Sequence, residues 1–480
     1  MNKSKILGFC LFVIFIIACK DKKTVTPAII VPPTPPTSQK SDVSVWLTNA
    51  DQSALFQQQN VSLVFKSEQN NNSTIVVDTA TTYQSIDGFG YTLTDGSASL
   101  MNALSAENKS AILEQLFAMD KTNIGVSYLR ISIGASDLNA EPYTFNDIPN
   151  GQTDVNLQQF NMDKAMTDLI PILKKIIAIY PDIKILGSPW TAPRWMKTNN
   201  SFKGGSLKPE YYQVYAKYLV KFIKKMKQEG IVIDAITPQN EPMHGGNNPS
   251  MVMTAAEQGS FIKTALGPIF RDEGINTKII IWDHNADRPE YPIEILNDPE
   301  ARPYVDGSAF HLYNGNISAL SQVRDAYPDK GIYFTEQWIG GPGNFAGDLK
   351  WHIETLIIGA TRNWSRNVLE WNLAADENYR PYTDGGCSTC LGAITVNSTV
   401  KKNTAYYIIA HASKFVRPGS VRIASNQMTD LPNVAFKAPD GKKVLIVLNK
   451  SSIIQAFNIK FKDKAVSTSL KAGSVATYVW

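Results

Sequence analysis

The sequence predicts an α/β fold, a (β/α)8 TIM barrel with an accessory all-β sandwich domain that is built from both chain ends. Between about residues 85 and 415, short apolar runs alternate with longer amphipathic stretches, which is the pattern of repeated βα units. Eight such runs can be counted, the number of strands in this barrel. On either side of this region, apolar and polar residues alternate one by one, as in half-buried strands.

The eight apolar runs have the length of strands, and the stretches between them are long enough for helices. We expect the strands at Ile86–Tyr91, Gly125–Ile133, Ile183–Pro189, Ile233–Pro238, Lys278–Asp283, Val305–Leu312, Gly331–Glu336 and Asn367–Asn372. The clearest helix is expected between Pro209 and Glu229, where an apolar stripe lies opposite a lysine-rich face. A proline at its start and Gly230 after its end are typical helix boundaries.

The alternating runs outside the barrel predict the second domain. They are Val61–Phe65, Thr74–Asp78, Val434–Phe436, Lys443–Leu448, Ala456–Lys460 and Ser474–Val479. Because they flank the barrel in sequence, one β-sandwich formed from both groups is the simplest arrangement. We therefore assign 43–84 and 416–480 to the sandwich and 85–415 to the barrel.

The first residues are predicted to direct export. Lys3 and Lys5 precede an apolar run, Ile6–Ala18, that is too short to span a bilayer and has the form of a signal-peptide core, so we assign 1–18 to a signal peptide. The run ends directly before Cys19 and resembles a bacterial lipobox, which makes Cys19 the expected lipid anchor. An ordinary signal peptide with an incidental cysteine is the alternative.

Proline, serine and threonine dominate the segment that follows, so 19–42 is predicted to be an extended tether. The expected location is therefore outside the cytoplasm, lipid-anchored to a bacterial membrane at the outer membrane or cell surface.

Charge argues against a nucleic-acid partner. Lys and Arg total 47 against 43 for Asp and Glu, and the formal net charge of +4 is spread along the chain instead of forming a basic block. Aromatic residues make up 10% of the chain and include nine Trp. Such a composition suits a protein that stacks flat faces against a ligand, although large cores also use aromatics.

Only Cys387 and Cys390 remain once the leader is set aside, and they form a C-x-x-C pair in a glycine-rich loop. Metal, redox and structural roles compete for this pair. One pair cannot complete a four-ligand zinc site, and a redox role would need a thioredoxin-like strand and helix context. In an exported protein a local disulfide that braces the loop is favoured. We expect no metal and no cofactor.

Two glutamates follow predicted strands four and seven, where a barrel carries its active site. Glu241 lies between two prolines in Thr237-Pro-Gln-Asn-Glu-Pro242, and Glu336 ends Ile332-Tyr-Phe-Thr-Glu336. Either one alone could be a rim carboxylate in a salt bridge. Strands four and seven face each other, so the pair could perform glycoside hydrolysis, which needs one carboxyl as acid and another as nucleophile, about 5–5.5 Å apart for retention.

Aromatic and polar residues at other strand ends complete the predicted site. Trp190, Trp338 and Trp371 can present indole faces to the apolar faces of sugars. A single tryptophan there is more often packing, but three at one rim are poorly explained by core filling. Polar partners are expected at the ends of strands two and six, namely Arg130, Asp137, His311 and Tyr313.

These motifs resemble glycoside hydrolase family 30 over roughly residues 60 to 480. The resemblance rests on Asp87-Gly-Phe-Gly90 with Thr94-Asp95, Leu129-Arg-Ile-Ser132, Ser188-Pro-Trp-Thr-Ala-Pro193, Asn240-Glu-Pro242 and Thr335-Glu336, in this order. It implies Glu241 as acid/base, Glu336 as nucleophile and Asn240 as the partner of the sugar 2-hydroxyl. It also implies a first subsite lined by Arg130, Asp137, Trp190, His311 and Trp371.

The segment Trp371-Asn-Leu-Ala374, with the Cys387 loop after it, looks like bacterial members of the family that act on β-1,6-glucan. The expected activity is therefore retaining hydrolysis of β-1,6-linked glucan, by an endo-β-1,6-glucanase or a β-1,6-glucosidase. A glucosylceramidase-like exo-β-glucosidase and a non-catalytic surface glycan-binding lipoprotein are the alternatives. A binding protein has no need of two intact carboxylates.

Overall fold

The computed structural model describes residues 41–67 and 70–480. The predicted signal peptide, Cys19 and the tether up to residue 40 lie outside the described residues. The last two tether residues are bound to the sandwich, because Ser41 Oγ accepts a hydrogen bond from Leu63 N and an Asp42 carboxylate oxygen accepts one from Phe65 N, both at 3.0 Å. Within the described ranges, no helix combines the length and the apolar character needed to cross a membrane.

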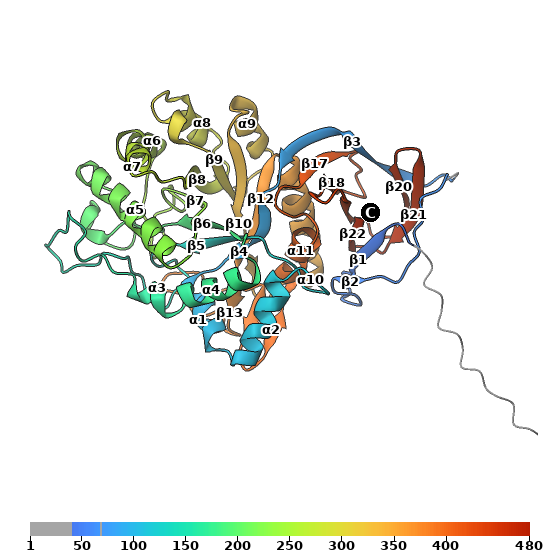
Figure 1. Ribbon diagram of the computed structural model, residues 1–480, viewed down its shortest axis with the longest axis horizontal. Coiled ribbons are helices and arrows are strands. Elements are labelled where there is room, and N and C mark those ends of the chain that lie inside the picture. Colours follow the sequence, from blue (N-terminus) through green and yellow to red (C-terminus); the bar gives the residue numbers. More distant parts are fainter. Residues whose placement is uncertain (1–40, 68–69) are drawn as a thin grey trace, which may run out of the picture. The chain divides into compact units, whose positions relative to one another are not determined.

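Eight parallel strands close into a barrel, which confirms the predicted fold class (Figure 1). In barrel order they are β4 (Gly88–Thr92), β5 (Tyr128–Ser132), β6 (Lys184–Ser188), β7 (Ala235–Ile236), β8 (Lys278–Ala286), β9 (Gly307–Gly315), β10 (Gly331–Glu336) and β12 (Ser365–Asn372). Seven of them contribute one residue each to a separate apolar cluster of Tyr128, Leu186, Ala235, Ile280, Ala309, Tyr333 and Leu369. The eighth, β4, places Gly90 in register between Leu369 and Tyr128. The barrel is therefore filled by side chains.

Strand β7 is shorter than the predicted Ile233–Pro238. Before it, the side chain of Asp234 accepts hydrogen bonds from Ile185 N at 2.9 Å and Lys184 Nζ at 2.8 Å. After it, Pro238 has no N–H to donate. The short strand lets the chain turn early into the cleft, and Glu241 lies in that turn.

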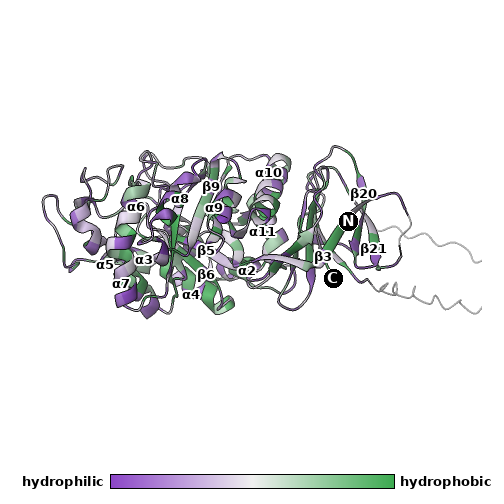
Figure 2. Cartoon of the chain, turned by 90° about the horizontal axis from the view of Figure 1, so that it is seen from above, coloured by the Kyte–Doolittle hydropathy of each residue, from purple (hydrophilic) through white to green (hydrophobic). Residues whose placement is uncertain are grey.

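Helices surround the barrel (Figure 1). They are α1 (Asp95–Ala103), α2 (Ala106–Phe117), α3 (Asp163–Thr167), α4 (Leu169–Ile179), α5 (Tyr212–Gln228), α6 (Ala255–Phe261), α7 (Gly267–Asp272), α8 (Glu290–Asn297), α9 (Ala319–Ala326), α10 (Phe345–His352) and α11 (Thr404–Ser413). The predicted helix is α5, preceded by a 3₁₀ turn at Pro209–Tyr211. Its apolar stripe is buried and its lysines face outward, as the hydrophilic colouring of its outer side shows in Figure 2.

The second domain contains one nine-stranded sheet in the order β2-β1-β22-β19-β18-β17-β3-β20-β21. Its strands are β1 (Ser44–Thr48), β2 (Gln57–Gln58), β3 (Ser73–Ser85), β17 (Val421–Ser425), β18 (Asn433–Lys437), β19 (Lys443–Leu448), β20 (Gln455–Phe461), β21 (Lys464–Leu470) and β22 (Val475–Val479). Phe457 and Tyr478 have ring centroids 6.1 Å apart, although four strands separate β20 from β22. The sheet therefore folds onto itself as a sandwich. Strand β3, which contains the predicted Thr74–Asp78, lies between the C-terminal strands β17 and β20, and β1, which was not predicted as a strand, pairs with the C-terminal β22.

One predicted strand is wrong. Val61–Phe65 is not a strand, although Lys66 just after it makes an isolated bridge to Ala465. Side-chain oxygens of Ser41 and Asp42 accept the N–H groups of this segment, so it has no ladder with a neighbouring strand. The valines that suggested burial, Val61 and Val64, are exposed.

The barrel and the sandwich are joined through α11, which lies between them in Figure 1. Every residue of this helix is buried. His411 Nδ1 lies 2.9 Å from Thr477 Oγ1 on β22, and its Nε2 lies 2.8 Å from Thr48 Oγ1 on β1. The last barrel helix is therefore also part of the sandwich interior.

Short strands also form in the loops after β10 and β12. They are β11 (Ile339–Gly340), β13 (Ala374–Ala375), β14 (Cys390–Leu391), β15 (Ile394–Val396) and β16 (Val400–Lys402). Pairing of β11 with β14 ties the segment after Trp338 to the cysteine loop.

Candidate active site

A cleft of about 510 Å³ opens where the barrel strands end. Eight of the ten predicted catalytic and sugar-binding residues line it: Asp137, Trp190, Asn240, Glu241, Tyr313, Glu336, Trp338 and Trp371. The other two, Arg130 and His311, are fully buried and bonded to the lining residues. The structure thus brings together all ten residues, which lie on six of the eight barrel strands or in the loops after them.

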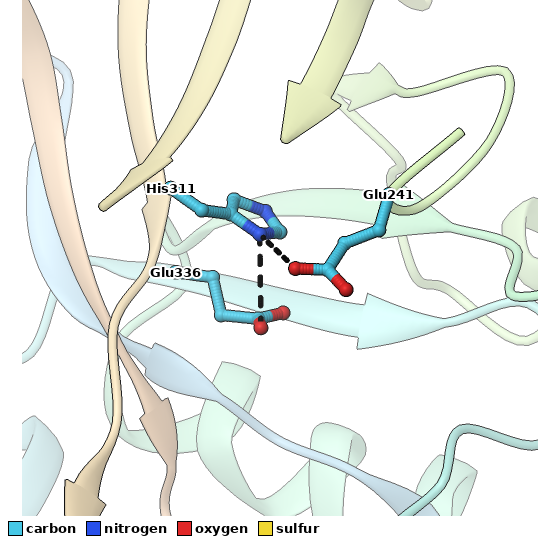
Figure 3. Close-up of side chains that lie close together, drawn as sticks. All are labelled: Glu241, His311 and Glu336. Atoms are coloured by element: carbon cyan, nitrogen blue, oxygen red, sulfur yellow. Dashed lines mark hydrogen bonds and ion pairs between the residues drawn. The ribbon is translucent and has the colours of Figure 1, made fainter. Parts of the chain in front are cut away.

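The two glutamates face each other across this cleft (Figure 3). Glu241 is in the left-handed region at φ +43°, and its backbone N–H donates to Asp283 O at 2.9 Å. Glu336 is the last residue of β10. One carboxylate oxygen of each lies within 4.8 Å of the other. This is well short of the about 6.5–9.5 Å that an inverting enzyme needs to place a water.

His311 contacts both glutamates (Figure 3). Its Nδ1 is 3.1 Å from Glu241 Oε1 and 3.7 Å from Glu336 Oε1, and its Nε2 is 3.1 Å from Asp283 Oδ1. Burial by itself would lower the pKa of His311, but the surrounding carboxylates outweigh it and raise that pKa to about 9. At neutral pH the ring is therefore charged and donates from both nitrogens.

Asp283, on the fifth barrel strand, β8, is a central residue of the site that the sequence analysis did not identify. Its carboxylate is fully buried, and it accepts hydrogen bonds from five side chains: Arg130, Ser188, Thr237, His311 and Thr335. Burial would raise the pKa of Asp283, but the charge of Arg130 and the hydrogen bond from His311 hold it well below its usual range. The missed signal is the one used for Glu241 and Glu336, an acid directly after a buried apolar run.

Arg130 holds three parts of the site in place. Its Nη1 donates to Glu336 Oε2 at 2.5 Å, and its Nη2 donates to Asn240 Oδ1 at 2.6 Å and Asp283 Oδ2 at 2.8 Å. The guanidinium lies over the ring of Trp190, with 4.7 Å from Cζ to the ring centroid. Since Arg130 can only donate, the amide of Asn240 must point its oxygen inward, which leaves its NH2 group for a ligand.

The surroundings of the two glutamates differ. Both oxygens of Glu336 accept hydrogen bonds, Oε2 from Arg130 and Oε1 from Tyr313 Oη at 2.9 Å. Glu241 uses only Oε1, and its Oε2 has no hydrogen-bond partner among the described residues. One oxygen of Glu241 is therefore free to exchange a proton with a ligand.

The pKa values of the pair shift in opposite directions. Burial and the charges of Glu241 and Asp283 raise the pKa of Glu336, although His311 and Arg130 lower it. Burial would also raise the pKa of Glu241, but the hydrogen bond and charge of His311 lower it. His311 therefore favours the ionised form of Glu241 when no ligand is bound.

An aromatic wall closes one side of the cleft. Trp190 and Trp371 stack with ring centroids 5.3 Å apart and an interplanar angle of 26°. Both are almost fully buried, and the half-buried Trp338 packs against the same cluster. Trp190 and Trp371 therefore leave little of their ring surface exposed in the cleft.

The cysteine loop completes this wall. Cys387 and Cys390 form a disulfide with an S–S distance of 2.07 Å. The backbone N–H of Cys387 donates to Asp137 Oδ2 at 3.2 Å. Burial, followed by the charge of Glu336, raises the pKa of Asp137 to about 7. The loop therefore holds a carboxyl group that is partly protonated at neutral pH.

Four further lining residues were not predicted: His244, Asn247, His284 and Asn285. The most informative is His284, whose Nε2 lies 3.9 Å from Glu241 Oε1 and whose buried Nδ1 has no hydrogen-bond partner. Burial lowers the pKa of His284 to about 4, so the ring is neutral. Its position directly after Asp283 follows the same strand-end signal that was missed there.

Glu241, His311 and Glu336 are also the one group of possible metal ligands found among residues 41–67 and 70–480. The donor set does not suit a cation. His311 is protonated and directs both nitrogens at carboxylates, and Arg130 and Tyr313 already occupy the oxygens of Glu336. A histidine can bind a metal only when its ring is neutral and one nitrogen has a free lone pair.

Comparison with known proteins agrees with this geometry. A model described as the glycosyl hydrolase family 30 TIM-barrel domain matches residues 86–416, and one described as the family 30 beta sandwich domain matches 419–478. The chain is 34% identical over 420 residues to an endo-1,6-beta-D-glucanase of Neurospora crassa, covering 82% of this chain and 85% of that protein.

Two other proteins extend the comparison. A solved structure described as the endo-beta1,6-glucanase BT3312 matches with a TM-score of 0.86 and 35% identity, over 92% of this chain and 99% of that one. The lysosomal acid glucosylceramidase of Mus musculus is 29% identical over 83% of this chain and 81% of its own length. With both domains matched and the carboxylate pair in place, the chain belongs to glycoside hydrolase family 30 and is a retaining glycoside hydrolase.

Proposed function

We propose that this protein is an endo-β-1,6-glucanase that hydrolyses its glucan by double displacement. The observation that carries the proposal is the buried carboxylate pair at retaining distance, in a chain 34–35% identical to proteins named endo-β-1,6-glucanases over most of its length. Both carboxylates are intact, which argues against a protein that only binds glycans.

Glu336 is the nucleophile in this proposal and Glu241 the acid/base. The pKa directions taken alone would favour the opposite roles. The hydrogen bonds support our assignment, because Arg130 and Tyr313 both donate to Glu336 and so favour its ionised, acceptor form. Glu241 alone has a free oxygen for the glycosidic oxygen.

In the first step, a Glu336 oxygen attacks the anomeric carbon while the bond to the leaving glucan oxygen breaks. Before this step Glu241 takes up a proton from His311 Nδ1 at 3.1 Å. It passes that proton to the leaving oxygen and becomes a carboxylate. In the second step, Glu241 removes a proton from water, and the water oxygen displaces Glu336 from the anomeric carbon. The Asn240 amide is positioned to donate to the sugar 2-hydroxyl during both steps.

The substrate test is to incubate the protein with pustulan, laminarin, xylan, cellulose and an aryl β-glucoside and to resolve products over time. Pustulan should be cut fastest, with oligosaccharides appearing before glucose. Early products seen by NMR should be β-anomers, and a first-formed α-anomer would contradict double displacement. Activity should survive a metal chelator.

A glucosylceramidase-like exo-β-glucosidase is the second candidate, favoured by the resemblance to glucosylceramidases. It differs in product pattern, because glucose would be the first product at every stage. Release of glucose alone from pustulan, or preference for an aryl or lipid glucoside, would support this candidate over the first.

We also propose that the protein is lipid-anchored through Cys19 on the outside of a bacterial cell. The support is the lipobox-like run before Cys19 and the proline-rich segment after it. A Cys19→Ser variant should lose labelling by a clickable fatty acid and partition into the aqueous phase of a detergent extraction. Unlabelled, aqueous wild-type protein would contradict the anchor while leaving the glucanase proposal intact.

A further inference from the structure

Two aromatic side chains stand out at the surface of the barrel. Among residues 41–67 and 70–480, the exposed large hydrophobic side chains include only two aromatics, Tyr313 at 39% and Trp351 at 40% exposure. Both line the same hollow of about 550 Å³, between the loop after β9 and helix α10. Because every other tryptophan is buried or half-buried, the exposure of Trp351 on this helix needs a reason.

This hollow and the catalytic cleft share one lining residue, Tyr313. The hydroxyl of Tyr313 is bound to the nucleophile candidate Glu336. Asp137, Trp190 and Trp371 lie at or after the ends of strands β5, β6 and β12, whereas the hollow begins at β9, which is opposite β5 in the closed barrel. If the sugar that reacts contacts Trp190 and Asp137, the leaving-group part of the glucan chain would therefore extend toward the hollow.

The indole of Trp351 is held in place. It packs edge-on against His352, with ring centroids 4.9 Å apart and an angle of 72°. His352 is buried, and its Nδ1 lies 2.8 Å from Glu370 Oε1 on β12. An exposed ring that is already fixed loses little conformational entropy on binding.

Polar groups suited to hydroxyls surround the two rings. Asn316 is exposed, and its amide nitrogen has no hydrogen-bond partner among the described residues. Glu354 is half-buried and binds Lys450 through Oε1 at 2.7 Å, which leaves Oε2 as an acceptor. A flat apolar ring bordered by a donor and an acceptor fits a pyranose, which has apolar C–H faces and equatorial hydroxyls.

We propose that this hollow is a distal subsite for the leaving-group side of the glucan chain, in which a glucosyl unit stacks on Trp351 after the chain passes Tyr313. The proposal deepens the glucanase function and rests on it. It predicts that Trp351 contributes to binding only for substrates that are long enough to reach it.

The test is the kinetics of Trp351→Ala on β-1,6-gluco-oligosaccharides of increasing length, with an aryl β-glucoside as the shortest substrate. We expect kcat/KM to be close to wild type on the aryl glucoside and to fall by about three- to tenfold on long chains, mostly through KM. Trp351→Phe should recover most of the loss. The proposal would be overturned if the ratio of kcat/KM between Trp351→Ala and wild type did not change with substrate length, whether that ratio is low or close to one.

Trp480→Ala is the matched control, because it removes another partly exposed tryptophan, at the end of the sandwich. It should show no length dependence, and thermal melts of both variants report on folding. If wild type cuts a different β-glucan, the length series is run with the oligosaccharides of that glucan. A wrong β-1,6 assignment would then show in the substrate preference of the wild type. A wrong subsite would show only when Trp351→Ala is compared with wild type.

The leaving-group side is tested by the cleavage pattern of a hexasaccharide labelled with ¹⁸O at its reducing end. Losing the distal stack should shift cleavage toward the reducing end, because long leaving groups lose their advantage. A shift toward the non-reducing end would place Trp351 on the wrong side and contradict the proposal.

Discussion

The two ends of the barrel each contain a hollow, and they differ in how their charges are arranged. At the lower end, a space of about 410 Å³ is lined by the beginnings of strands. There Asp87 binds Arg366 and Asp234 binds Lys184, so each carboxylate has its own cation. None of its described non-glycine lining residues has a positive φ.

At the upper end, three carboxylates share two buried cations. Glu241, Asp283 and Glu336 surround Arg130 and His311. Glu241 and Asp283 are also held at positive φ, +43° and +64°. The two hollows are of similar size, so volume does not identify the site. Unbalanced charge and backbone strain identify the active site, because both lower stability and persist where function requires them.

The largest effect should follow removal of the nucleophile. Glu336→Gly should lower the hydrolysis of every substrate by at least about 10⁴-fold, because the covalent step is lost. Azide can fill the vacated space and attack once, so it should give the α-glucosyl azide. Asp234→Asn at the lower end is the control and should keep wild-type activity. A β-azide from the Glu336 variant would contradict its role.

Loss of the acid/base should depend on the leaving group. In Glu241→Ala, glucan hydrolysis should fall by about 10²–10⁴-fold, whereas an activated aryl glucoside should still form the intermediate. Azide needs no base, so it should speed turnover of the aryl substrate and give the β-glucosyl azide, identified by NMR. Equal loss on both substrates would show that the two glutamates have been assigned the wrong way round.

The shared charges at the upper end should be more costly to disturb than the pairs at the lower end. Asp283→Asn leaves Arg130 buried with fewer partners and should lower the free energy of unfolding by about 3–5 kcal/mol. Asp234→Asn removes a pair whose side chains are 22% and 44% exposed, so it should cost less than about 1 kcal/mol. Urea denaturation measures both, and equal costs would refute the comparison.

The smallest effect is a difference in pH dependence between two buried histidines. The pKa of His311 is raised from 6.5 to about 9, so its contribution to stability is full below about pH 6.5 and is lost as pH rises through 9. Burial lowers the pKa of His411 to about 3, so stability is instead lost as pH falls below about 6.5. Thermal melts of His311→Gln and His411→Gln against wild type should show opposite slopes with pH, and slopes of the same sign would contradict these charge states.

Much of the fold and the site could be predicted because both depend on local patterns. All eight barrel strands lie at or within a few residues of their predicted positions, since each is a buried apolar run bounded by turn residues. Glu241 and Glu336 were found because an acid after such a run is unusual. Asp283 carries the same signal, so missing it was an error of reading and not a limit of the sequence.

Other features depend on contacts that sequence does not reveal. Val61–Phe65 has the alternation of a strand, but side chains of Ser41 and Asp42 occupy its N–H groups. The bond between Tyr313 and Glu336 depends on the register of two strands. The bond between Asp137 and Cys387 joins residues 250 positions apart. Such pairings are set by the closure of the barrel and by long loops, and no local pattern encodes them.

The placement of β1 has a consequence for how the protein is made. Residues Ser44 and Val479 are register partners, so a strand at the beginning of the chain pairs with the strand that is synthesised last. The barrel lies between them in sequence, and its α11 needs both strands to bind His411. N-terminal elements usually fold first during synthesis, but here the edge of β1 must wait unpaired until β22 has been made. Folding should therefore finish only after β22 has been synthesised, and loss of β22 should leave β1 and α11 without their partner.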